Sequence, residues 1–299
     1  MALEIVLDKF LLSSERVSHP VIYAFYSGAL GLFAVIIGFF FGGLHQIGVA
    51  KIVFSFIAGT IFIYGMLALF FAVRKGEASR VLPVVGAIIP IATFFLSIFF
   101  LHEHLGLREA LGIGALVLGG LLISFDLDKL EKRIFFKGFR ASILAGFFLA
   151  LSAIMIKVLY NGDNFLNVFA WTRAGAFLGT FSFFLIPAWR RAIFGSLLKF
   201  KNPERETQKS GLSFVLAKVL GGSGSFLKEF ATSLVLASVT IVSALVSVEY
   251  VFIFMLSIIF SAWVPEVMQE KKDWKTILQK ICAIVIIAIG ISLVSHVRK

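Results

Sequence analysis

Residues 94–100 read FFLSIFF and residues 254–260 read FMLSIIF, and five of the seven positions are identical when these two stretches are aligned. A similar alignment pairs Gly119 with Gly290 inside two further apolar stretches. Weak similarity of this kind between the two halves of an apolar chain indicates an internal repeat. The sequence therefore predicts a fold made of two copies of one unit.

The chain of 299 residues contains long apolar segments separated by short polar connectors. Hydrophobic residues make up 59% of it and charged residues 15%, whereas soluble domains carry about 25% charged residues. This composition excludes a soluble enzyme, a nucleic-acid-binding module and a secreted disulfide scaffold, and it predicts an all-α integral membrane protein. An α-helix needs about 20 residues to cross about 30 Å of hydrocarbon. The expected spans are residues 20–42, 52–73, 81–101, 110–125, 141–160, 165–189, 212–236, 240–263 and 279–297.

The N-terminal segment does not fit a complete span, because the apolar stretch from Leu3 to Leu12 is short and contains charged residues. The internal repeat aligns this stretch with the second half of the span at 141–160. We therefore expect a ten-helix plan whose first helix is incomplete in this chain, with a nine-helix protein as the alternative. Residues 1–125 form the first five-helix repeat, residues 126–140 form a basic connector, and residues 141–299 form the second repeat.

The orientation of the repeats follows from their number of helices. Because five is odd, the second copy enters the membrane from the opposite side, and the two repeats are inverted. The connectors on one side contain 19 Lys and Arg residues, and those on the other side contain 4. Since basic connectors stay cytoplasmic, the net charge of +11 reports orientation and places the C-terminus outside.

Two stretches of the chain resemble a known family. The sequence GEASR at 76–80, which continues through Pro83 and Pro90 to LSIFFLHE at 96–103, is similar to EamA-type transporters of the drug/metabolite transporter superfamily. The glycine-bearing stretch GIGALVLGGLLIS at 112–124 is similar to the same family. The resemblance implies a ten-helix secondary carrier of metabolites, amino acids, drugs or nucleotide sugars. It also implies that both termini face the cytoplasm, which conflicts with the count of basic residues and leaves the absolute orientation open.

Charged side chains inside the spans are the first candidates for function, since each costs about 2.5–3.5 kcal/mol to insert at a helix centre. Lys228 and Glu229 lie in the span at 212–236, Glu249 lies in the next span, and Arg173 lies in the span at 165–189. The helical rise places them at a common depth of about 12–15 Å. We expect a polar cluster near the membrane midplane in which a cation exchanges its carboxylate partner for substrate. The alternative is an ion pair that fixes helix register without touching substrate.

Glycines and amphipathic rings are further candidates. Gly221, Gly222 and Gly224 lie within one span, where each costs roughly 1 kcal/mol in a helix interior. They predict either a broken helix that exposes backbone groups to substrate or a close helix crossing. We expect Lys157, near a span end, to extend toward the lipid headgroups. The rings that could line a substrate pocket, with an apolar face and a polar tip, are those of Tyr26, Tyr64, Trp171 and Tyr250.

Together these features predict a secondary transporter of a small metabolite or drug-like solute that works by alternating access. Proton coupling, exchange and facilitated diffusion are the alternatives for its energetics. A lipid-linked sugar flippase or a non-transporting membrane partner is the alternative function. The sequence contains no Walker motif, paired metal-ligand site or nucleophile elbow, so we expect no enzymatic activity, metal or cofactor. The expected partners are a small solute and the bilayer of the cell membrane, without nucleic acid; a homodimer is left open.

Overall fold

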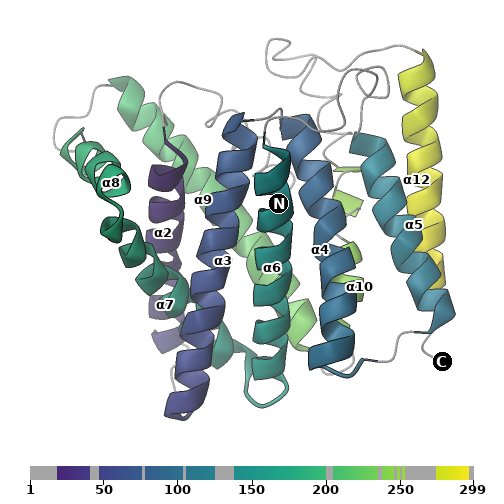
Figure 1. Cartoon of the computed structure of the whole chain (residues 1–299), viewed down its shortest axis with the longest axis horizontal. Coiled ribbons are helices and arrows are strands. Elements are labelled where there is room, and N and C mark those ends of the chain that lie inside the picture. Colours follow the sequence, from purple (N-terminus) through teal and green to yellow (C-terminus); the bar gives the residue numbers. More distant parts are fainter. Residues whose placement is uncertain are drawn as a thin grey trace.

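The computed structural model describes residues 19–40, 47–75, 78–103, 106–124, 138–199, 205–234, 238–245, 248–249, 251–252 and 274–295. Nearly all of this part is helical, and it contains no strand (Figure 1). The helices are α2 (Pro20–Phe40), α3 (Val49–Lys75), α4 (Ala78–Phe100), α5 (Leu107–Ser124), α6 (Phe139–Tyr160), α7 (Phe165–Phe181), the 3₁₀ helix η2 (Ser182–Leu185), α8 (Pro187–Lys199), α9 (Arg205–Ser233), α10 (Val239–Ala244) and α12 (Trp274–Ser295).

Within this part, four segments are long and apolar enough to cross a membrane: Pro20–Phe40, Val49–Lys75, Phe139–Tyr160 and Phe165–Leu185. Two shorter apolar segments follow: Val84–Phe100 in α4, which packs on α6, and Leu278–Val294 in α12, which packs on α5. The expected all-α, multi-pass membrane fold is confirmed. The incomplete helix expected at Leu3 to Leu12, and most of the span expected at 240–263, lie outside the described residues.

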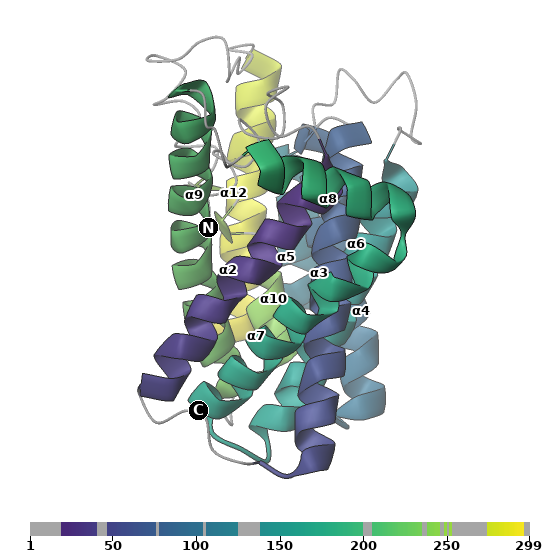
Figure 2. The ribbon, with the colours of Figure 1, turned by 90° about the vertical axis from the view of Figure 1, so that its left-hand side faces the viewer.

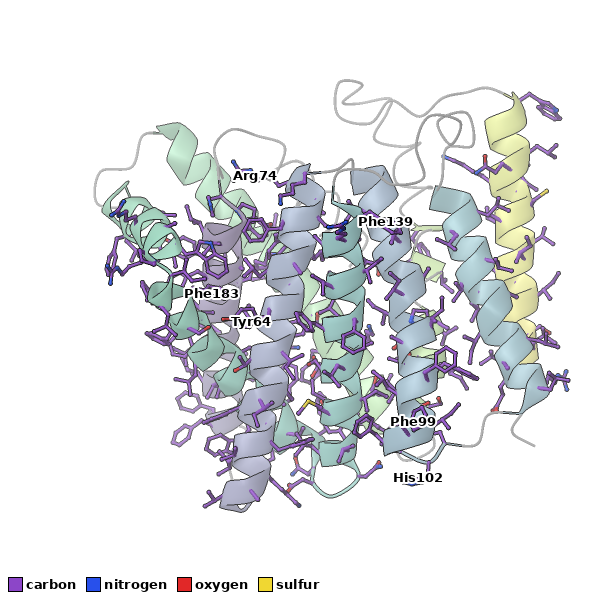
Figure 3. The ribbon with its side chains drawn as sticks, viewed as in Figure 1. Tyr64, Arg74, Phe99, His102, Phe139 and Phe183 are labelled. Carbon is purple, nitrogen blue, oxygen red and sulfur yellow. The ribbon has the colours of Figure 1, made fainter. Side chains whose placement is uncertain are left out.

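The two ends of the bundle differ in charge. Arg74 and the start of α6 at Phe139 lie at one end, and Phe99 and His102 lie at the other (Figure 3). The first end, called here the basic end, carries exposed Arg and Lys side chains at the end of α3, the start of α6 and in α8. The start of α2 also lies at this end, because His19 packs edge-on against Phe71 with ring centroids 6.1 Å apart.

Helix α8 corrects one sequence prediction, which treated residues 190–211 as a connector and extended the preceding span to residue 189. The span ends earlier, at Leu185: helix α7 ends at Phe181, η2 continues to Leu185, and the backbone at Ile186 is then extended, with φ −95° and ψ 115°. Pro187 follows Ile186, and proline disfavours a helical conformation at the preceding residue and lacks the N–H that a continuing helix needs. Helix α8 therefore starts anew, and Figure 2 shows it lying across the steeper helices of the bundle.

Close crossings between small residues hold several of the helices together. A Cβ added to Gly119 would lie 2.6 Å from Ile287 and 3.1 Å from the carbonyl oxygen of Ala283. A Cβ added to Gly290 would lie 2.8 Å from Leu116 and 3.0 Å from the carbonyl oxygen of Gly112. The sequence alignment that pairs Gly119 with Gly290 also pairs Leu116 with Ile287 and Gly112 with Ala283, so each glycine meets the residues equivalent to those that the other meets. Helices α5 and α12 therefore meet through equivalent faces.

Helix α9 is packed differently from its neighbours. Helix α3 makes extensive backbone contacts with α6 and α7, and α5 does so with α12. In the described part of the chain, α9 approaches α6, α7 and α10 at few backbone positions. Among the residues that the structure describes, side chains rather than close helix crossings therefore hold α9 against its neighbours.

Candidate functional site

Arg173 lies near the middle of α7, a helix whose start is set by Asn164. The Asn164 side chain accepts a hydrogen bond from the backbone N–H of Asn167 at 3.1 Å, as an N-cap does. The guanidinium carbon of Arg173 lies 4.9 Å from the ring centroid of Phe62 on α3 and 4.9 Å from that of Phe169 on α7. Two aromatic faces therefore hold this cation among apolar groups.

Glu229 of α9 is the ionic partner of Arg173. The two side chains form an ion pair and expose only 13% and 17% of their surface. The hydroxyl of Tyr160, the last residue of α6, donates a hydrogen bond to the second carboxylate oxygen of Glu229 at 3.3 Å. The pair thus joins α6, α7 and α9 at one point.

Lys228 and Glu249 extend this group of charges. The ammonium of Lys228 interacts electrostatically with the carboxylates of both Glu229 and Glu249. Glu249 is half-buried and lies in the short described segment 248–249. The structure therefore brings together all four charged residues that the sequence singled out, here called the central cluster: Arg173, Lys228, Glu229 and Glu249.

The depth of the central cluster differs from the sequence prediction. Helix α9 ends at Ser233, before the predicted end of the span at 236, so Glu229 lies about 6 Å from the helix end. Tyr160 lies at the end of α6. The cluster is therefore displaced from the middle of the bundle toward the end opposite the basic end.

The structure places Lys157 in the interior, so the prediction that its amine extends to the headgroups is wrong. Its side chain is almost fully buried, and the ammonium donates hydrogen bonds to the backbone oxygens of Thr232 at 2.8 Å and Leu234 at 2.9 Å. These oxygens belong to the C-terminal end of α9, where unpaired carbonyls and the negative end of the helix dipole attract a cation. The hydrogen bonds of Lys157 thus connect the C-terminal end of α9 to the last turn of α6.

The aromatic side chains that were expected to line one substrate pocket lie in different parts of the bundle. The hydroxyl of Tyr26 lies 3.2 Å from the Ser196 hydroxyl of α8, and that of Tyr64 lies 2.7 Å from the Ser182 hydroxyl of η2. Trp171 packs against Phe56 of α3, with ring centroids 5.9 Å apart. Tyr26 and Tyr64 therefore connect the helices to η2 and α8, whereas Tyr250 lies outside the described residues.

The expected helix break is absent, because α9 continues as an α-helix from Arg205 to Ser233 through Gly221, Gly222 and Gly224. The close crossing that was the alternative is also absent at Gly222, where an added Cβ would find no atom within 4 Å. The intrahelical hydrogen bonds of the flanking residues suffice to carry the helix through glycines that each cost roughly 1 kcal/mol.

Sequence reasoning missed Tyr160, Phe62 and Phe169 as neighbours of the charged pair. Tyr160 and Phe62 are far from Arg173 in the sequence, so no local pattern links them to it. Phe169 lies one helical turn before Arg173 and could have been paired with it from the sequence. Among the described residues, no group of three or more His, Cys, Asp or Glu side chains is placed to hold a metal ion.

Comparison with known proteins gives a family match for the first 125 residues of the chain. Residues 1–125 match the sequence model of the EamA-like transporter family, so the resemblance inferred from the motifs is confirmed there. An uncharacterised protein of Methanocaldococcus jannaschii is 37% identical over 73 residues, which are 24% of this chain and 53% of that protein. The chain thus matches about half the length of that relative. A solved crystal structure, described simply as that of a protein, aligns with 100% of this chain and 95% of its own at a TM-score of 0.62 and 13% identity, which shows a shared fold.

Proposed function

We propose that this chain, which carries an EamA-like unit in residues 1–125, is a secondary transporter that moves a small solute across the cell membrane by alternating access. The observation that carries the proposal is the ion pair between Arg173 and Glu229, which joins α7 to α9 inside the bundle. Charges within membrane-spanning helices are costly, and in membrane proteins they mark solute and ion pathways. A pair made between two helices can also open and close as those helices move.

Two inverted five-helix repeats, residues 1–125 and 141–299, provide the moving parts in this proposal. The contacts of Gly119 and Gly290 between α5 and α12 support such a relation, since they are equivalent under the alignment of the two halves of the sequence. Transporters built from inverted repeats expose a central site to each side in turn by rocking one part against the other.

The proposed cycle exchanges the partner of Arg173. In the solute-free state the guanidinium binds Glu229, and the Tyr160 hydroxyl steadies the carboxylate. A solute that binds Arg173 releases Glu229, whose charge Lys228 then neutralises. Separation of Arg173 from Glu229 removes the ion pair between α7 and α9. The rings of Phe165 and Phe169 on α7 still pack against Phe226 of α9, so that α9 can shift about these apolar contacts while the solute is bound.

The test uses the purified protein in sealed vesicles. Vesicles are incubated with a defined mixture of small metabolites, with and without a pH gradient, and mass spectrometry identifies the solutes that enter. We expect at least one solute to enter vesicles with the wild-type protein and not protein-free vesicles. Glu229→Gln should abolish this uptake. Dependence on the pH gradient separates proton coupling from exchange and facilitated diffusion.

A matched control and a double variant separate function from stability. Glu109→Gln changes a carboxylate at the start of α5 that accepts a hydrogen bond from the Gly106 N–H at 2.9 Å, and the amide oxygen can still accept it. Its uptake should equal that of the wild type. The double variant Arg173→Gln, Glu229→Gln removes both charges of the ion pair. It therefore avoids the cost of roughly 3–5 kcal/mol that arises when only one partner of a buried pair is removed. Normal uptake by the folded double variant would show that the pair is structural and would refute the proposal.

A further inference from the structure

Helix α8 directly follows a membrane span at the basic end of the bundle. The span Phe165–Leu185 is long and apolar enough to cross a membrane, and α8 begins just after its end, at Pro187. With 13 residues, α8 is about 20 Å long, which is too short to cross the hydrocarbon. It lies across the steeper helices, as Figure 2 shows. This position and direction are those of a helix that lies in the membrane surface.

One face of α8 packs on the bundle. Ile193 is fully buried in the core. The ring centroid of Trp189 lies 6.3 Å from that of Phe71, near the end of α3, and 5.8 Å from that of Phe183 in η2. Trp189, Ile193 and Ser196 follow one another at helical spacing, so they form a single inward face. The other residues of α8 are left to face its surroundings.

The outward side of α8 combines cations with apolar side chains. Arg190 and Arg191 are exposed, and Phe194 and Leu197 expose 52% and 42% of their surface. At about 100° of rotation per residue, Arg190, Phe194 and Leu197 fall on one flank of the helix. A long cationic side chain among apolar neighbours at a membrane surface extends its charge to the headgroups while the neighbours contact acyl chains.

The end of α3 adds two cations beside α8. Arg74 and Lys75 are exposed in the last turn of α3, and the Lys75 ammonium lies 5.9 Å from the centroid of Phe71, the ring that Trp189 meets. The sequence segments 74–80 and 187–211 contain nine Lys and Arg residues against three Glu, so the acidic residues nearby do not cancel this charge. We call these exposed residues the α8 surface: Arg74, Lys75, Arg190, Arg191, Phe194 and Leu197.

We propose that the α8 surface binds the headgroups of anionic phospholipids in the adjoining leaflet, with Phe194 and Leu197 beside their acyl chains. Guanidinium groups form strong hydrogen bonds with phosphate oxygens. Lipid is the occupant because these cations lie among exposed apolar side chains at the end of a membrane span. Each cation near an anionic membrane strengthens binding about fivefold. The α8 surface is separate from the central cluster, and the inference does not rest on the proposed transport.

The binding test compares two lipids with identical acyl chains, anionic phosphatidylglycerol and zwitterionic phosphatidylcholine. The purified full chain in detergent is titrated with each lipid, and native mass spectrometry gives the two Kd values. We expect phosphatidylglycerol to bind roughly tenfold or more tightly than phosphatidylcholine, since only its net charge complements the surface. Equal Kd values for the two lipids would overturn the inference.

Variants of α8 link the lipid preference to this surface. Arg190→Gln with Arg191→Gln should weaken phosphatidylglycerol binding roughly 25-fold and leave phosphatidylcholine binding unchanged, whereas Arg190→Lys with Arg191→Lys should keep the preference. Arg108→Gln with Arg140→Gln is the matched control, because it removes two exposed arginines from α5 and α6. Its phosphatidylglycerol binding should change by less than about threefold, since salt screens distant charges. An equal loss in the control would show that net charge rather than α8 attracts the lipid and would overturn the inference.

Two soluble anions test for an occupant other than lipid. Inorganic phosphate and a polyglutamate peptide are added in turn, each at the concentration of the bound phosphatidylglycerol. Neither should displace the lipid, because neither offers an acyl chain to the apolar part of the surface. Displacement by phosphate would assign the surface to a soluble anion, and displacement by the peptide would assign it to an acidic protein partner. Either result would overturn the inference.

Discussion

Replacement of Gly59 by alanine would place a methyl group inside the crossing between α3 and α7. The added Cβ would lie 2.1 Å from the carbonyl oxygen of Thr172, 2.5 Å from the amide nitrogen of Ala176 and 2.8 Å from the carbonyl carbon of Gly175. All three atoms are backbone atoms, so no side chain can rotate to make room. Ordinary van der Waals contact starts at 3.4 Å, so the two helices must move apart before the methyl group fits.

The expected loss of folding free energy follows from this displacement of the two helices. The shift is on the order of 1 Å, and a radial gap of about 0.5–1 Å already forfeits a quarter to a half of the dispersion energy of the atoms that line it. Overpacking of a well-packed site costs about 1–3 kcal/mol and occasionally more. Because Gly175 of α7 meets the backbone of Phe56 almost as closely, the whole crossing is affected, and we expect a loss of about 3 kcal/mol.

The assay is thermal unfolding of the purified protein in detergent, with Gly222→Ala as the matched control. Gly222 is an exposed helical glycine with no atom within 4 Å of an added Cβ, so alanine there should be neutral or stabilise by up to about 1 kcal/mol. We expect the Tm of Gly59→Ala to fall by roughly 5–10 °C. Equal Tm values for the two variants would show that α3 and α7 do not meet at this crossing.

Three further variants test other contacts. The His19 ring nitrogen accepts a hydrogen bond from a backbone N–H of α2 at 3.3 Å, and burial first, with the nearby Arg74 second, lowers the pKa of His19 from its usual 6.5. The stabilisation by neutral His19 is therefore complete above pH 6.5 and is lost as the pH falls through the lower pKa of the folded state. His19→Asn keeps a hydrogen-bond acceptor and should reduce the dependence of the Tm on pH between about pH 5 and 7. An unchanged pH dependence of the Tm would exclude His19 as the cause. Lys157→Met removes both donors to the end of α9 and should cost about 1–3 kcal/mol, with faster hydrogen exchange at that end; unaltered exchange would contradict the contact. Gly290→Ala should destabilise the α5–α12 contact by about 1–3 kcal/mol in thermal unfolding, because Leu116 lies 2.8 Å from the added Cβ, and an unshifted Tm would argue against that crossing.

The charged residues illustrate what could be predicted of the site. Arg173, Lys228, Glu229 and Glu249 were identified because a charge within an apolar run is visible in the sequence itself. Their grouping could be anticipated from helical rise, but their partners could not. Tyr160 contacts Glu229 across 69 positions of sequence, and that contact depends on how α6 and α9 are rotated about their axes.

The glycines and tyrosines show where local reasoning fails. Gly222 was expected either to break α9 or to allow a close crossing, yet the helix continues and its glycine faces no neighbour. Tyr26 and Tyr64 were expected to line a pocket, yet their hydroxyls pair with serines of α8 and η2 that lie 170 and 118 positions away. Propensity and residue type describe what a side chain can do and leave open which element it meets.

The sequence by itself determined that this chain is an all-α membrane protein, the approximate positions of the four long apolar spans found among the described residues, and which few charges lie in its apolar runs, because apolar length and inserted charge are properties of a single helix. The tertiary structure alone decided that Arg173 meets Glu229, that Lys157 fastens the end of α9, and that α8 lies across the bundle. These features depend on the rotation and spacing of packed helices, which contacts at positions such as Gly59 set across long stretches of sequence.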